Sequence, residues 1–187
     1  MSTTIEVVLA SLDLCPLGHA DHTGILHDLG VAFVLCYDQD GNVVDLNRAI
    51  EIQQRRLDLC PIGHPEHVVA LGELAVSLTR HYHIQRNTAA LNRLIEMHQK
   101  WLDMCPPGHL YHTKALGELA ASLGACYNVQ KNIADLNRSI EMAEKLLHLC
   151  PPGDPEHSNA LNDLALSLIA RYRRQHHLID LNRAIDL

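Results

Sequence analysis

Histidine pairs recur along the sequence and have the residue type and spacing that could bind a metal ion. The chain holds fourteen histidines and six cysteines. Three of the histidine pairs have i, i+3 spacing: His19/His22, His64/His67 and His109/His112. On a continuous helix this spacing places two imidazoles on one face, where both can reach one metal ion.

Helix capping is the interpretation that we favour for the first histidine of each pair. In a fourth segment of the same pattern, Asp154 stands at this position, just before a predicted helix. An aspartate caps a helix because its carboxylate accepts a backbone N–H. No third ligand for a mixed metal site is evident, so we predict no metal site. A histidine-rich, metal-responsive module remains an alternative.

The cysteines are expected to be free thiols. Cys15, Cys60, Cys105 and Cys150 occupy one position in successive segments, and Cys36 and Cys126 occupy another, two segments apart. Packed helices lie about 8 to 10 Å apart, whereas a disulfide needs Cα atoms within about 7 Å. No C-x-x-C motif occurs. Free thiols fit a reducing compartment, so we expect a cytoplasmic protein.

No motif in the sequence predicts catalysis. The sequence lacks G-x-S-x-G, H-E-x-x-H and a glycine-rich loop for phosphates. We therefore expect no enzyme, no catalytic residue and no cofactor.

Two ladders of opposite charge recur at equal positions. The acidic one is Asp28, Glu73, Glu118 and Asp163, and the basic one is Arg48, Arg93, Arg138 and Arg183. We predict that the two ladders pair with each other between neighbouring segments. A solvated face and a ligand site are the alternatives.

Composition and charge limit the partners. The chain has 187 residues, 4% of them aromatic, and carries fifteen basic against twenty-two acidic residues. Its net charge of −7 repels phosphate backbones and anionic membranes, so we expect no nucleic-acid partner. The longest apolar run, residues 31–37, is far below the roughly 20 residues of a membrane span, so we expect no membrane association.

An internal repeat sets the architecture. Similar segments begin at Leu14 (LCPLGHADH), Leu59 (LCPIGHPEH), Met104 (MCPPGHLYH) and Leu149 (LCPPGDPEH), each 45 residues after the last. The same offset relates LNRAI, LNRLI, LNRSI and LNRAI at positions 46, 91, 136 and 181. The chain is therefore predicted to be a repeat array.

Each repeat is predicted to be a helix hairpin. In the second repeat, apolar residues at helical spacing place the first helix at about residues 65–82. Asp45, Asp135 and Asp180 stand where the second helix would need its N-cap, and that helix should end before Cys60-Pro61. A single hairpin cannot bury its apolar face, so the hairpins must stack into an all-α solenoid around Leu74, Leu119 and Leu164.

Three sequence features resemble tetratricopeptide repeats. They are the L-x-x-L-A-x-x-L spacing of the first helix (71–78, 116–123 and 161–168), the Ala-Ile pair of the second helix (49–50 and 184–185) and the closing proline (61, 106 and 151). The G-H-P-E-H entry is similar to kinesin light chain units, and the 45-residue length resembles arrays in large fungal proteins that also carry NTPase or CHAT peptidase domains. The resemblance implies a right-handed α-solenoid of stacked antiparallel hairpins. Arg56 and Trp101 depart from it, because small residues are common there.

The predicted organisation is a single array over residues 1–187. Its units are about 20–64, 65–109, 110–154 and 155–187, preceded by a partial helix at 1–14. Since no polar capping helix is evident at either end, we expect a fragment of a longer array. A complete protein with frayed ends is the alternative.

A second stripe on the first helices is the predicted binding surface. It flanks the core face at about 80° to 140° from Leu71 at 100° per residue, and in the resembling family this flank lines a concave groove. Its members are small and mostly apolar: His27, Val31, Val34, Gly72, Val76, Thr79, Gly117, Ala121, Gly124, Asn162, Leu166 and Ile169. The helical glycines could equally serve close packing of an adjacent helix.

From this stripe we predict a protein-interaction scaffold whose partner is a protein or peptide. The partner would bind in the groove as an apolar helix or an extended peptide. The alternative is a structural array that forms homo-oligomers through uncapped ends.

Overall fold

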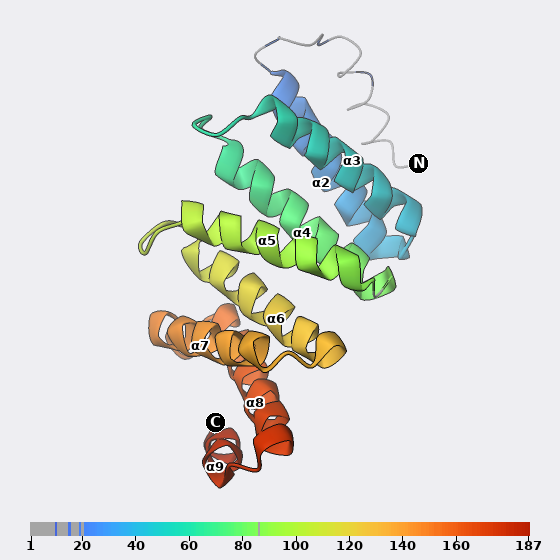
Figure 1. The fold of residues 1–187 in the computed structure, drawn as a ribbon. Helices are drawn as coiled ribbons and strands as arrows, with labels where there is room; N and C mark the ends of the chain where they lie inside the picture. The colour runs from blue at the N-terminus through green and yellow to red at the C-terminus, as the bar shows by residue number, and fades with distance from the viewer. Residues whose placement is uncertain (1–9, 11–14, 16–18, 20, 86) are drawn as a thin grey trace. The chain divides into compact units, whose positions relative to one another are not determined.

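The structure, a computed structural model, describes residues 10, 15, 19, 21–85 and 87–187. The chain divides into two compact units, residues 1–85 and 86–187. Every regular element among the described residues is an α-helix, and successive helices within each unit pack against each other (Figure 1). This confirms the predicted all-α solenoid class.

The helices follow one another with short connections. The first unit holds α2 (His22–Asp40), α3 (Val43–Leu59) and α4 (His67–Gln85). The second unit holds α5 (Thr88–Met104), α6 (His112–Gln130), α7 (Ile133–Leu149), α8 (Pro155–Gln175) and α9 (Leu178–Asp186). The predicted partial helix at 1–14 lies outside the described residues, apart from Ala10.

The predicted N-caps of the second helices are wrong. The helices begin three residues earlier than predicted, and Asn42, Asn87 and Asn132 cap α3, α5 and α7 by accepting the N–H two residues on. Asp45 lies in the first turn of α3, where its carboxylate accepts a hydrogen bond from Asn42 Nδ2 at 3.0 Å. An acidic residue is favourable in this turn because the helix dipole is positive there.

Leucines at equal positions of the first helices form the core. Leu74, Leu119 and Leu164 have exposed fractions of 1%, 0% and 2%. Leu164 belongs to a buried cluster with Leu136, Ile140 and Ala143 of the second helix α7, as the helical spacing predicts. The core prediction is therefore confirmed.

A tight turn separates each second helix from the next first helix. Gly63, Gly108 and Gly153 have φ angles of 95°, 91° and 101°, which side-chain-bearing residues rarely adopt. The helix before the turn ends at Leu59, Met104 or Leu149, just before the cysteine and proline. The predicted stop at the Cys-Pro dipeptide is therefore confirmed.

Candidate functional site

The first histidine of each pair accepts a backbone hydrogen bond. His19, His64 and His109 accept, at Nδ1, the N–H two residues on, at 3.2, 3.1 and 3.2 Å. In the fourth repeat, Asp154 Oδ1 accepts the N–H of Glu156 at 2.8 Å. The imidazole and the carboxylate thus accept the same backbone hydrogen bond at equivalent positions. The capping interpretation is confirmed.

The second histidine ties the helix start back to the preceding cysteine. His22, His67, His112 and His157 approach, with Nδ1, the carbonyl oxygens of Cys15, Cys60, Cys105 and Cys150 at 2.8, 2.5, 2.6 and 2.8 Å. A carbonyl oxygen can only accept, so Nδ1 carries the proton and donates. The constant separation of seven residues between cysteine and histidine was the sequence signal for this bond.

The thiols of these loops are poorly placed for chemistry. Cys60, Cys105 and Cys150 are buried, and all six cysteines of the chain are free. Burial raises the pKa of the Cys60, Cys105 and Cys150 thiols above the ordinary value. Since the thiolate is the reactive form, these cysteines contribute packing.

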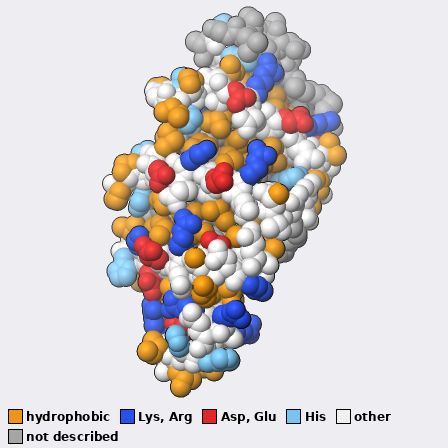
Figure 2. Space-filling model, viewed as in Figure 1, with side chains coloured by type: hydrophobic (Ala, Val, Ile, Leu, Met, Phe, Trp, Pro, Cys, Tyr) orange, Lys and Arg blue, Asp and Glu red, His pale blue; other side chains and the backbone are white. Residues whose placement is uncertain are grey.

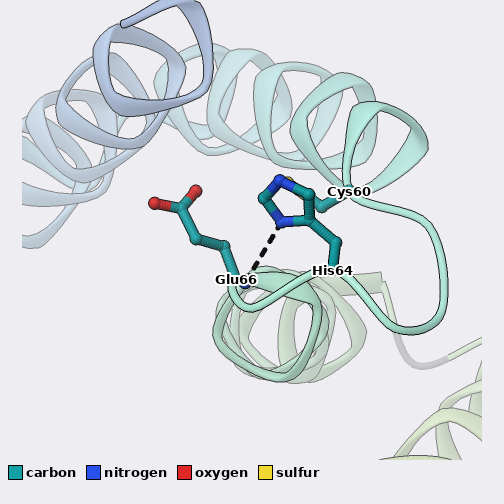
Figure 3. A group of neighbouring side chains, drawn as sticks. All are labelled: Cys60, His64 and Glu66. Atoms are coloured by element: carbon teal, nitrogen blue, oxygen red, sulfur yellow. Dashed lines mark hydrogen bonds between the residues drawn. The ribbon is translucent and has the colours of Figure 1, made fainter. Parts of the chain in front are cut away.

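One loop brings three metal-ligating groups together. Cys60, His64 and Glu66 each offer a ligand atom within 4.8 Å of the other two (Figure 3). A third ligand had been considered only between repeats; within this one loop, Glu66 offers a third ligand atom. The donor set, one sulfur, one nitrogen and one oxygen, suits zinc.

Two features of the same loop oppose a metal ion. His64 Nδ1 already accepts the Glu66 N–H, as the dashed line in Figure 3 shows, so a metal at Nε2 would require a proton on Nδ1 facing that donor. The Arg56 guanidinium also lies 3.2 Å from Glu66 Oε2 and adds a positive charge beside the ligands. The loop is therefore built for capping first.

The buried Arg56 is the centre of a charge network whose other members are partly exposed. Its exposed fraction is 4%, and its Nη1 donates to Glu73 Oε2 at 2.5 Å while its Nη2 donates to Glu66. The other Glu73 oxygen lies 2.8 Å from His27 Nδ1, close enough for an ion pair with a protonated ring, although the geometry is not that of a hydrogen bond. The network joins α2, α3 and α4.

The predicted pairing of the acidic and basic ladders is wrong. Glu73 pairs with Arg56, which is not in the basic ladder. The ladder arginines bind elsewhere: Arg48 to Asp45, Arg138 to Gln99 and Arg183 to Glu144. The last two interactions join the second helices of adjacent repeats. Equal spacing along the sequence does not specify which helix of a neighbouring repeat each arginine reaches.

The positions of the predicted binding stripe differ in exposure. Val31, Ala121, Asn162 and Leu166 are exposed, and Gly72 is buried. The remaining members are partly buried: His27, Val34, Val76, Thr79, Gly117, Gly124 and Ile169. The exposed members are the ones that a partner can reach.

The glycines of the stripe have neighbours in adjacent helices. A Cβ at Gly117 would lie 3.2 Å from Leu146 Cδ2, and one at Gly124 would lie 3.3 Å from Ser139 Oγ. Both distances are tighter than ordinary contact. Close packing against α7 therefore accounts for these two glycines.

On the face drawn in Figure 2, acidic and basic side chains are interspersed with apolar ones. No single-sign region dominates that face. Among the described helices, none is long and apolar enough to cross a membrane.

Solved structures with the same fold were found. The chain is 17% identical to tetratricopeptide-like repeats from Podosopora anserina, described as a kinesin light chain, with a TM-score of 0.59 over 97% of this chain and 82% of that one. A single-substitution variant of that protein matches with the same identity and TM-score, over 97% of this chain and 81% of that one. The fold is tetratricopeptide-like. No family profile and no curated protein matches the sequence.

Proposed function

We propose that the protein is an interaction scaffold that holds an apolar helix or extended peptide along the exposed stripe of its first helices. The observation that carries this proposal is the exposure of Leu166, at 60%, on α8, with exposed Ala121 on the contacting helix α6. Contiguous exposed apolar surface on a protein commonly marks a contact site for a partner. The tetratricopeptide-like fold of the neighbours supports it.

Aspartate substitutions on the stripe test this proposal. A peptide selected for binding to the folded chain should lose affinity for Ala121→Asp and for Leu166→Asp, because a carboxylate would be desolvated under the partner. Leu110→Asp is the matched control, since Leu110 is an exposed loop leucine away from the stripe. If binding survives both stripe changes, the stripe is not the binding surface.

Self-association is the second candidate, favoured by the apolar surface of α9. Leu178, Ile179 and Ile185 have exposed fractions of 63%, 72% and 72%. Sedimentation distinguishes the two: a scaffold stays monomeric without its partner, whereas a self-associating array gains mass with concentration. Ile185→Asp should abolish that gain if α9 forms the contact.

A metal-responsive role is the third candidate, favoured by the group Cys60, His64 and Glu66. Zinc titration followed by calorimetry tests it. A tight site of unit stoichiometry that His64→Ala removes and His109→Ala retains would establish the role. The control is matched because His109 caps its helix in the same way but has Tyr111 in place of Glu66.

A further inference from the structure

A cavity of about 550 Å³ opens between α5, α6 and α7 of the second unit. Sites for small molecules commonly have volumes of about 300 to 1,000 Å³. The lining residues are Gln99, Leu102, Pro107, His112, Leu116, Met142, Lys145, His148 and Leu149. None of them belongs to the predicted stripe, so this cavity is a separate candidate site.

The apolar part of the lining continues the core. Leu116, 2% exposed, belongs to the same buried cluster as Leu146, and Leu102 and Met142 pack against that cluster. Leu149 is 49% exposed and also lines the cavity. A methionine adapts its shape to an inserted group, so this wall suits a flexible apolar chain.

The polar part of the lining is basic and neutral, with no acidic side chain. Lys145 Nζ donates to Glu141 Oε1 at 2.6 Å. Both side chains are more than half exposed, so this ion pair is weak. An ammonium group has three N–H donors, so Lys145 can also bind a second carboxylate. His112 and His148 use Nδ1 on the carbonyl oxygens of Cys105 and Glu144. Their Nε2 atoms are left for other hydrogen bonds.

We propose that this cavity binds a small amphipathic carboxylate of the fatty-acid type. The acyl chain lies against Leu102, Leu116 and Met142, and the carboxylate pairs with Lys145. An apolar wall with one nearby cation and no lining anion favours this ligand over a neutral or cationic amphiphile of the same length.

Three matched amphiphiles test the choice of ligand. Dodecanoate, dodecanol and dodecyltrimethylammonium are titrated into the full chain below their micelle concentrations and followed by calorimetry. The expected result is one dodecanoate per chain, weaker binding of dodecanol and the weakest binding of the cation. Equal binding of all three, several ligands per chain or no binding of dodecanoate would overturn the proposal.

Matched variants test the location of the site. Lys145→Glu should weaken dodecanoate binding up to about fivefold, the upper end of the scale of one exposed charge contact. Lys114→Glu changes the charge equally at an exposed lysine outside the cavity lining and should have no effect. Both lysines are exposed, so neither change threatens folding.

Leu149→Asp should weaken binding of dodecanoate, whereas Leu166→Asp should leave it unchanged. The two leucines have exposed fractions of 49% and 60%, which makes the pair matched. The same pair separates this site from the proposed scaffold surface, because peptide binding should show the opposite pattern. Equal loss in a control and its partner would place the ligand elsewhere and overturn the proposal.

Discussion

Of four equivalent positions in the two units, two hold an arginine and a histidine in the first unit but a leucine and a glycine in the second, while the other two are acidic in both. In the first unit, Arg56 on α3 binds Glu66 and Glu73, and Glu73 faces His27 on α2. The positions 90 residues later lie in the second unit.

At these later positions Leu146 stands in place of the arginine and Gly117 in place of the histidine, and a Cβ at Gly117 would lie 3.2 Å from Leu146 Cδ2. The acidic positions persist as Glu156 and Asp163. Without the arginine, burial raises the pKa of Asp163, and the nearby Glu156 carboxylate adds to the rise while Asn162 opposes it by a hydrogen bond.

The comparison teaches that one fold position accepts two kinds of stabilisation. A buried arginine is tolerated where two carboxylates and a histidine surround it. A leucine is tolerated where the opposing residue is a glycine, because only then is there room for its methyl groups. Each arrangement depends on the residues at all of these positions. Replacing one residue by its equivalent from the other unit should therefore lower the stability of the fold.

The largest predicted effect concerns His98 in the second unit, which stands where the first unit has Gln53. His98 is fully buried, its Nδ1 lies 2.9 Å from Ser122 Oγ, and burial lowers its pKa to about 4. Between pH 6.5 and 4 the unfolded chain binds the proton and the folded chain does not, so stability falls as the pH is lowered. The expected loss over this range is roughly 3 kcal/mol.

Urea unfolding of the natural chain and of His98→Gln at pH 7, 5.5 and 4 measures this effect. The variant carries the residue of the first unit and cannot titrate, so its stability should fall less on acidification. Identical pH profiles for the two proteins would contradict the prediction.

The second effect is expected for Arg56→Leu, which gives the first unit the residue of the second. The change leaves Glu66 and Glu73 without their cation. The new leucine also lacks the space that Leu146 has, because His27 stands where the second unit has Gly117. Because the two carboxylates are partly exposed, the expected loss of unfolding free energy is about 2 kcal/mol, below that of a fully buried pair. Chemical denaturation measures it.

Arg55→Leu is the control for this change, since Arg55 is the exposed neighbour on the same helix. Adding Glu73→Gln to Arg56→Leu should recover part of the loss. A loss in the control as large as that for Arg56 would mean that the charge network is not the cause.

A smaller effect of opposite sign is expected for Asp163→Asn in the second unit. A carboxyl group whose pKa is raised by folding destabilises the fold once it ionises, so stability falls as pH rises through its titration range. The amide removes this penalty. Thermal unfolding should show a higher midpoint for the variant at pH 7, and the gain should vanish when the pH falls below the ordinary pKa of aspartate; a lower midpoint at pH 7 would refute it.

The smallest effect concerns two cysteines at equivalent positions, Cys36 in the first unit and Cys126 in the second. Cys36 is partly buried, whereas Cys126 is buried with its Sγ 3.5 Å from Asp135 Oδ2. Burial, followed by the Asp135 carboxylate, raises the pKa of Cys126 to about 11. Iodoacetamide at pH 8 should therefore label Cys36 first, as read by peptide mass spectrometry.

Equal labelling of the two cysteines in the folded chain would contradict this order. In urea both should react at one rate, because the difference comes from the fold.

The helical class, the core leucines and the capping by the first histidines could all be predicted from the order of residues along the chain. Period, helical spacing and the exchange of His109 for Asp154 carry these features, since each depends on residues close together in the chain or repeated at a fixed offset. The true N-caps at Asn42, Asn87 and Asn132 were also readable from an asparagine just before each helix, but the aspartates three residues after Asn42 and Asn132 obscured them.

The tertiary structure alone decided which charges pair and where the free space lies. Arg56 on α3 donates to Glu73 on α4, Leu146 packs against Gly117, and the cavity beside Lys145 lies between three helices. Such contacts depend on the angle and distance at which packed helices meet. A repeat period fixes which residues are equivalent, but side-chain length and local packing set the partner that each one reaches.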